Sequence, residues 1–225
     1  MTLLIRGLSN WIVALIAGLV SLSSSGMADE PSKPLSGNVE SCGTLQGFAS
    51  VEAYGLKTTT GGGNLPPIVV RSAQELRVAA ERSDLKNKAQ RDSTPRVILV
   101  AQDLDLGELA NAKPGAELKS VGRILVRSHT TIHAAGTGAT LRRGTLDIHG
   151  AQNVILRNLR FRDLWELDPT GEYDRFGWDS VRITNSGPAT SHHVWIDHCD
   201  FGKVYDGMLD ITHGSDLVTI SWCRF

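Results

Sequence analysis

Three aspartates in the C-terminal part of the sequence have the type and spacing that could support chemistry. Asp206 and Asp210 lie close together, and Asp179 lies upstream in a segment of its own. Carboxylate oxygens are the ligands that the hard cation Ca²⁺ prefers, and a bound dication acts as a Lewis acid toward an anionic substrate. A trio of acids taken alone is more often a set of solvated bend residues. A metal site therefore requires a fold that brings these three side chains together.

A second group, His192, His193, His198 and Cys199, has the residue types that zinc prefers. Adjacent residues of a β-strand point to opposite faces, so His192 and His193 are predicted not to converge on one ion. We therefore expect no zinc site here. Cys199 and Cys223 are expected to be packed thiols rather than a disulfide, because inward-facing cysteines on strands pack as small apolar residues.

Three segments of the sequence repeat one pattern of apolar residues, and a shorter match precedes each of them. The long segments are 153–161, 193–201 and 217–225, and the short ones are 146–148, 181–183 and 209–211. The apolar columns are Val154/Val194/Val218, Leu156/Ile196/Ile220, Leu159/Cys199/Cys223, Phe161/Phe201/Phe225 and Ile148/Ile183/Ile211. Val126 with Ile132 resembles an earlier, weaker copy. Each repeat is predicted to be two short strands joined by a tight bend.

These aligned columns predict the fold. A repeat of this size cannot bury its apolar side alone, whereas stacked copies bury a continuous core, with equivalent strands about 4.8 Å apart. We predict an all-β chain whose residues 124–225 form a right-handed parallel β-helix, with Ile148, Ile183 and Ile211 stacked in neighbouring coils. The alternative is a β-sandwich with coincidental alternation, but sandwich strands do not recur in aligned columns.

The N-terminal segment is predicted to lie outside this domain. Arg6, an apolar run over 11–22 and small residues before Asp29 are typical of a signal peptide, 1–28, cleaved after Ala28. An uncleaved membrane anchor is the alternative, but the run is too short to span a bilayer. Residues 29–44 are expected to be a mobile lead-in. The protein is therefore predicted to be secreted, to the exterior or the periplasm, with residues 45–225 as the β-helix domain.

Local signals predict a helix and two strands ahead of the repeats. Ser72 followed by Glu75 forms a capping box, which indicates a helix over 73–82. Its buried face is predicted to hold Leu76, Ala79 and Ala80. This helix is expected to cover the N-terminal end of the solenoid. Strands are expected near 66–70 and at 96–100, where β-branched residues are frequent.

The overall charge excludes some classes of protein. The formal net charge is −1, so the chain lacks the basic excess of a nucleic-acid-binding protein. It also lacks a global field that would attract an acidic polymer, so any such attraction must be local. Three cysteines in the whole chain do not form a disulfide scaffold.

Motifs in the repeats resemble those of pectate lyases of the parallel β-helix type (polysaccharide lyase family 1 type). Residues 193–198 read HVWIDH and are similar to the WiDH signature of that family. Residues 206–211 and 214–221 resemble the DGxxDI and GSxxVTxS blocks that follow it. Landmarks at 47–49, 60–62, 131–138 and 153–159 occur in the family's order. The resemblance covers about residues 45–225, and its specificity lies in the length and order of the matches.

This resemblance implies a secreted, monomeric enzyme that cleaves the acidic polysaccharide polygalacturonate by β-elimination, with no nucleic-acid partner and no membrane partner after signal cleavage. In the family, Ca²⁺ neutralises the uronate carboxylate and acidifies the C5 proton, which an arginine removes as the C4 oxygen leaves. The calcium ligands carry over to Asp206 and Asp210 of the DGxxD block and to Asp179 of the preceding coil. Asp197 and His198 belong to a segment that is structural in the family.

The repeat register supports the same ligand set. Asp210 lies between Leu209 and Ile211, which face inward, so its side chain is expected to face outward. Its neighbour one coil back is Arg182, and Asp179 lies just upstream of that residue. Acids on neighbouring coils about 4.8 Å apart can share one Ca²⁺. Arg182 is expected to be a surface residue near the metal that can contact substrate.

The resemblance assigns no catalytic base within this chain, because the family's basic residues lie downstream of the DGxxD block, beyond Phe225. The last repeat is also not followed by a polar cap, which a solenoid end requires. We therefore expect a truncated and inactive fragment of a pectate lyase. The alternatives are a pectin lyase, which needs no Ca²⁺, and a non-catalytic carbohydrate-binding or adhesin solenoid. The three retained acids favour pectate lyase over both.

Overall fold

The computed structural model describes residues 44–109, 122–164, 178–185, 188–204 and 206–225. The chain divides into Met1–Ser36 and Gly37–Phe225, and every described residue belongs to the second unit. The predicted signal peptide lies outside the described residues, as does the lead-in up to residue 43. No helix in the described part of the chain is long and apolar enough to cross a membrane.

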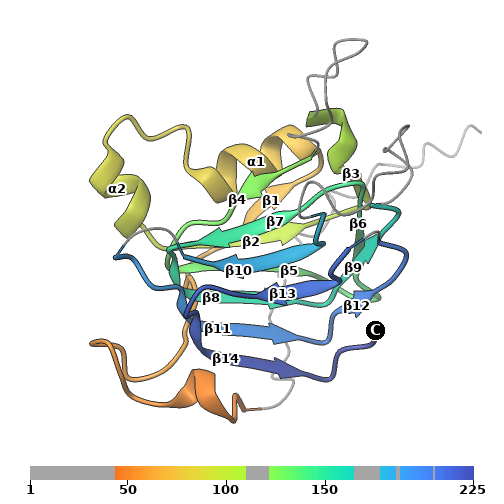
Figure 1. Cartoon of the computed structure of the whole chain (residues 1–225). Helices are drawn as coiled ribbons and strands as arrows, with labels where there is room; N and C mark the ends of the chain where they lie inside the picture. The colour runs from red at the N-terminus through yellow and green to blue at the C-terminus, as the bar shows by residue number, and fades with distance from the viewer. Residues whose placement is uncertain (1–43, 110–121, 165–177, 186–187, 205) are drawn as a thin grey trace, which may run out of the picture. The chain divides into compact units, whose positions relative to one another are not determined.

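Strands of successive coils stack into three parallel sheets (Figure 1). The first sheet holds β1 (Ile68–Val70), β2 (Arg96–Val100), β5 (Thr130–Ala134), β8 (Gln152–Arg157), β11 (His192–Asp197) and β14 (Asp216–Ser221). The second holds β4 (Ile124–Leu125), β7 (Leu146–His149), β10 (Val181–Thr184) and β13 (Leu209–Ile211). The third holds β3 (Leu104–Asp105), β6 (Ala139–Arg142), β9 (Leu159–Arg162) and β12 (Asp200–Phe201). The chain visits the sheets in turn, so the predicted parallel β-helix is confirmed.

The stacked columns read from the sequence are present in the strand register. Ile183 pairs with Ile148 on one side and with Ile211 on the other. Val194 likewise pairs with both Val154 and Val218. The rings of Phe161, Phe201 and Phe225 stack with centroids 4.9 and 5.0 Å apart. Cys199 and Cys223 are free thiols, as expected. These ladders of identical or similar side chains form the core that runs along the solenoid.

Two features of the solenoid differ from the prediction. Its first rung is β1, so the strands begin well before residue 124. Each coil also contributes to three sheets rather than two, because the predicted strand at 153–161 bends at Asn158 into β8 and β9. Asn158 and its equivalents His198 and Trp222 have φ of 54°, 51° and 53°. A left-handed residue at the bend keeps apolar side chains inward on both strands, so the pattern alone resembles one strand.

Helix α1 (Ala73–Glu81) confirms the predicted helix. The Ser72 side chain accepts a hydrogen bond from the Glu75 N–H at 3.1 Å, as the capping box requires. The helix buries Leu76, Ala79 and Ala80 and packs against β1, β2 and β4, so it covers the first rungs as predicted (Figure 1).

A second helix, α2 (Lys88–Ser93), and two 3-10 turns, η1 (Phe48–Ser50) and η2 (Leu106–Leu109), were not predicted. Helix α2 buries no residue, so it leaves no apolar periodicity in the sequence.

Candidate functional site

Asp179 and Asp210 meet on neighbouring strands of the second sheet. Asp179 precedes β10, and Asp210 lies in β13. Between them, the Gly207 N–H donates a hydrogen bond to Asp179 Oδ1 at 2.9 Å. A Cβ on Gly207 would lie 2.5 Å from Asp179 Oδ1 and 2.4 Å from Asp210 Oδ1, so both carboxylates face one point. The turn before β13 therefore needs glycine for space, and it brings two of the three predicted ligands together.

The third predicted ligand, Asp206, is exposed at the start of the same turn. It lies near enough for its negative charge to raise the pKa of Asp179. Nevertheless, no group of three or more His, Cys, Asp or Glu side chains within the described ranges is placed closely enough to hold a metal ion. The arrangement is thus a pair of facing carboxylates with a third acid at its rim. Asp174, a possible further acid, lies outside the described residues.

Burial and like charge together perturb Asp179. Its side chain is 1% exposed. Burial raises the pKa of Asp179 to about 6, and the charges of Asp210 and Asp206 act in the same direction. The Gly207 N–H and the Arg182 guanidinium oppose this rise without cancelling it. A buried carboxylate that faces another carboxylate is a poor structural element and a good candidate for cation binding.

Arg182 is one rung from Asp210 in the register, as predicted, but its side chain turns the other way. Its Nε lies 3.3 Å from Oδ1 of Asp147, the residue that precedes it in the same column. The Arg182 side chain is only 24% exposed. Arg182 therefore lies near the acids, yet it is a partly buried partner of Asp147 rather than an open surface residue.

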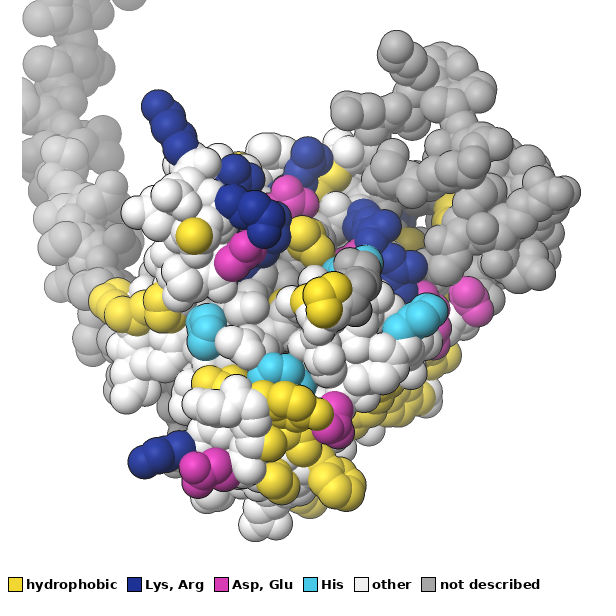
Figure 2. Space-filling view, turned by 60° about the vertical axis from the view of Figure 1, so that its left-hand side comes forward, with side chains coloured by type: hydrophobic (Ala, Val, Ile, Leu, Met, Phe, Trp, Pro, Cys, Tyr) yellow, Lys and Arg dark blue, Asp and Glu magenta, His cyan; other side chains and the backbone are white. Residues whose placement is uncertain are grey.

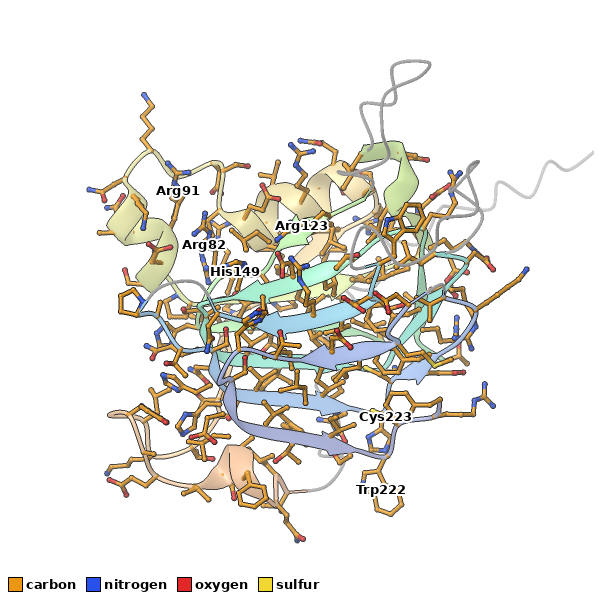
Figure 3. The ribbon with its side chains drawn as sticks, in the orientation of Figure 1. Arg82, Arg91, Arg123, His149, Trp222 and Cys223 are labelled. Atoms are coloured by element: carbon orange, nitrogen blue, oxygen red, sulfur yellow. The ribbon has the colours of Figure 1, made fainter. Side chains whose placement is uncertain are left out.

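Asp147 was not singled out by the sequence analysis. It is 0% exposed and accepts a hydrogen bond from Arg123 Nε at 2.7 Å, and His149 Nδ1 lies 3.9 Å from its Oδ2. Figure 3 shows Arg123 and His149 beside the strands of the second sheet. The column Asp147–Arg182–Asp210 alternates in charge along the stack. That alternation was present in the aligned repeats and could have revealed the residue.

Asp197 lies in a different sheet from the paired acids and contacts basic and hydroxyl side chains. It is 1% exposed, accepts a hydrogen bond from Ser221 Oγ at 2.7 Å and pairs with Arg157 at 3.1 Å. His198 Nδ1 lies 2.8 Å from Asp197 Oδ2, the same oxygen that pairs with Arg157. Trp195 is also packed, with its Nε1 donating to Ser221 Oγ at 2.8 Å. These contacts agree with the structural role expected for the HVWIDH segment.

The argument that His192 and His193 point to opposite faces was wrong. His193 has φ of 55°, which interrupts strand alternation, and the Nδ1 atoms of the two rings lie 2.8 Å apart. The Tyr54 ring stacks on His192 at 4.4 Å, and its hydroxyl donates to Asp216. His193 Nε2 lies 2.9 Å from the Val51 carbonyl oxygen. The pair therefore fastens the N-terminal segment onto the first sheet.

Comparison with known proteins supports one family. The pectate lyase family model matches residues 11–225. Pectate lyase B of Paenibacillus amylolyticus is 33% identical over 210 residues, covering 80% of this chain and 51% of that protein. This chain spans about half, or less, of the length of the curated relatives it matches.

Solved structures show the same fold. A pectate lyase from Paenibacillus sp. 0602 aligns with a TM-score of 0.58 and 30% identity, covering 79% of this chain and 41% of that one. A pectate lyase from Bacillus sp. N165, solved with trigalacturonate, aligns with a TM-score of 0.54 and 21% identity, covering 80% and 52%. The match to the family model over nearly the whole sequence, together with these relatives, shows that the chain belongs to the pectate lyase family.

Proposed function

We propose that Asp179, Asp206 and Asp210 bind Ca²⁺ in a secreted pectate lyase that cleaves polygalacturonate by β-elimination. The observation that carries this proposal is the buried Asp179 carboxylate facing Asp210, with a pKa raised to about 6. Calcium dependence is general in the family to which the chain belongs. The relative solved with trigalacturonate supports an acidic polysaccharide as the partner.

The donor set fits this ion better than a transition metal. All three candidate ligands are carboxylates, whereas zinc sites in proteins are built mainly from His and Cys, with Asp or Glu as an additional ligand. Calcium takes about six to eight oxygen ligands, so one buried carboxylate, one partly buried carboxylate and one exposed carboxylate leave positions for water and for the uronate carboxylates of the substrate. Because Asp147 engages Arg182, that guanidinium offsets the negative charge of the acid pair only in part.

Bound Ca²⁺ would neutralise a uronate carboxylate and so lower the pKa of the neighbouring C5 proton. The chain's own residues have separate tasks. Asp179 and Asp210 hold the cation, and Gly207 keeps the two carboxylates close to the backbone. Arg182, one rung from Asp210, is proposed to contact a substrate carboxylate. We assign no residue of this chain as the base that removes the C5 proton.

The test is calcium binding by the full chain, measured by isothermal titration with and without trigalacturonate. Asp210→Asn should weaken binding at least tenfold, because it removes one charge from a pair of facing carboxylates. Asp103→Asn is the matched control, because Asp103 lies beside the third sheet and accepts a hydrogen bond from the Thr140 N–H. Equal calcium affinity in Asp210→Asn and the wild type would refute the ligand assignment.

Activity is tested separately through the ultraviolet absorbance of the unsaturated uronide that β-elimination produces. Any lysis by this sequence, alone or within a longer chain, should disappear in a chelator and in the Asp210→Asn variant. Asp103→Asn should behave like the wild type. Lysis that persists in the chelator would show that the reaction does not use calcium.

A further inference from the structure

An arginine cluster lies where α1 and α2 meet the first rungs of the solenoid, remote in sequence from the paired acids. It consists of Arg82, Arg91, Arg96 and Arg127, and its two carboxylates are Asp84 and Asp92. Figure 3 shows Arg82 and Arg91 in the region between the two helices, and Figure 2 shows Lys and Arg side chains gathered over this part of the surface. Four guanidinium groups and two carboxylates leave an excess of positive charge.

Both carboxylates of the arginine cluster already have partners. Asp84 forms a two-point ion pair with Arg96, at 3.0 and 2.7 Å. Asp92 accepts from Arg127 at 3.0 Å and from Lys88, one turn away in α2, at 2.9 Å. Lys88 is 83% exposed and solvated, so it adds little to the charge balance of the cluster. Among the described residues, no carboxylate forms an ion pair with the two remaining guanidinium groups, those of Arg82 and Arg91.

Arg82 is the most unusual member of the cluster because its side chain is fully buried, at 0% exposed. Its guanidinium donates to neutral acceptors: the carbonyl oxygens of Arg91 at 2.9 Å and Ser128 at 2.6 Å, and Thr130 Oγ1 at 3.0 Å. Burial, together with the positive charges of Arg96 and Arg127, lowers the pKa of Arg82 to about 10. The negative charges of Asp92 and Asp84 oppose this shift less strongly. Within the described residues, Arg82 therefore carries a buried charge without a counter-ion.

Three donors in the cluster have no acceptor. The Nε atoms of Arg82, Arg91 and Arg127 are all buried, and no described group of the protein accepts a hydrogen bond from them. Buried polar atoms in folded proteins are almost always hydrogen-bonded, and an unmade bond at a charged group is costly. Three such atoms of one kind on neighbouring arginines indicate an acceptor that the protein itself does not supply.

We propose that this arginine cluster binds a small dianionic oxyanion of the phosphate or sulfate class. Two uncompensated guanidinium charges match one dianion, and a tetrahedral oxyanion offers acceptors in several directions at once. A single carboxylate would leave one charge unmatched. The Arg127 side chain is 24% exposed, so the cluster reaches the surface at this residue. The bound ion would connect the C-terminal end of α1, helix α2 and the loop between β4 and β5, and so fasten the cover over the first rungs.

The test uses sodium phosphate as the probe, in calcium-free buffer, with binding measured by isothermal titration and thermal unfolding of the full chain. Phosphate also stabilises proteins in general through exclusion from their surface, so sodium chloride of equal ionic strength is run in parallel. The wild type should bind phosphate saturably and gain more in Tm than it does in chloride. Arg91→Gln should weaken phosphate binding at least fivefold.

Arg77→Gln is the matched control, because Arg77 lies on α1 and pairs with Glu81 at 3.7 Å, outside the cluster. It should bind phosphate like the wild type. Arg127→Gln serves as a second test, since it removes an orphaned donor without replacing the fully buried Arg82. Galacturonate, a monocarboxylate, should bind much more weakly than phosphate.

Two results would overturn the anion site, and a third would overturn the class of anion. One is a wild type with no phosphate-specific rise in Tm. The other is wild-type phosphate affinity in both Arg91→Gln and Arg127→Gln. Tighter binding of galacturonate than of phosphate would show that the class of anion is wrong.

Discussion

Asp147, in β7, and Asp179, just before the neighbouring strand β10, are buried aspartates with opposite surroundings. Asp147 is 0% exposed and is held by Arg123 and Arg182. Asp179 is 1% exposed and faces another carboxylate, Asp210, and its pKa is raised to about 6. The two residues occupy neighbouring coils, so the fold around them is nearly the same. Their difference lies in which charges the adjoining rungs supply.

This comparison distinguishes a structural acid, Asp147, from a candidate cation-binding acid, Asp179. A buried charge is tolerated when the protein provides an opposite charge and hydrogen bonds, and it is costly when it does not. For Asp147 the compensation comes from arginines on both sides of its strand. For Asp179 the protein adds further negative charge, so compensation must come from a proton or from a cation outside the chain. Arg182 lies between the two and is engaged by the structural acid.

The largest expected effect is on the structural acid. Asp147→Asn should reduce the free energy of unfolding by about 2–3 kcal/mol, because an amide replaces charge-assisted hydrogen bonds from two arginines and turns a donor toward them. Urea denaturation at pH 7 measures this loss. Asp163→Asn is the control, since Asp163 pairs with the exposed Arg142 in the third sheet and should cost less than about 1 kcal/mol. Equal losses in the two variants would remove the distinction drawn for Asp147.

Gly207→Ala tests the paired acids by placing a methyl group between the two carboxylates. The new Cβ would collide with oxygens of both Asp179 and Asp210, so one carboxylate must move. We expect a loss of about 1–3 kcal/mol in stability and at least a tenfold loss in calcium affinity. Gly202→Ala is the matched control, because the nearest atom to its Cβ would be a side-chain atom of Arg162 at 3.6 Å. A calcium affinity unchanged by Gly207→Ala would argue against the paired site.

Asp179→Asn should have the opposite sign to Asp147→Asn when calcium is absent. Removing a buried charge that faces like charge should raise the free energy of unfolding by about 1–2 kcal/mol at pH 7.5, since each unit of pKa shift corresponds to about 1.4 kcal/mol. The same variant should lose the stabilisation that calcium gives the wild type. Urea denaturation with calcium and with chelator measures both effects. Destabilisation in the chelator would mean that Asp179 is a structural acid after all.

Much of the fold could be predicted because the solenoid repeats its own pattern. Columns such as Ile148, Ile183 and Ile211 report strand register directly, and they also place Arg182 beside Asp210. The number of strands per coil could not be read in the same way. A left-handed residue such as Asn158 turns the chain while keeping apolar residues inward. Helix α2 has no buried face and leaves no periodic pattern.

The sequence predicted which residues of the site lie on neighbouring strands, but not which side chains contact one another. Register alone places Arg182 between Asp147 and Asp210, and it does not say toward which acid the side chain turns. The exposure of Asp206 depends on the turn around Gly207 rather than on strand alternation. The contact between His192 and His193 depends on the positive φ of His193, which no alternation rule anticipates.

The smallest expected effect is a pH dependence that belongs to Asp179 alone. Its folded-state pKa of about 6 is above the ordinary value of 3.8, so the folded protein binds this proton more tightly than the unfolded chain. Without calcium, this group's contribution to stability is therefore greatest at low pH and is lost as pH rises through 6, with a slope of at most about 1.4 kcal/mol per pH unit.

Carboxylates such as Asp84 and Asp200 have lowered pKa values, so their contributions change at lower pH and with the opposite sign. Subtracting the wild type from Asp179→Asn isolates the effect. The difference in unfolding free energy should grow between about pH 4.5 and pH 7 in chelator. Saturating calcium should reverse this trend for the wild type, because the cation binds the deprotonated acid and its stabilisation grows as pH rises. Urea titrations at several pH values, with and without calcium, measure both slopes. A difference that stays constant across this range would show that Asp179 does not titrate there. The protein itself would then balance the negative charge of Asp179, as it does for Asp147.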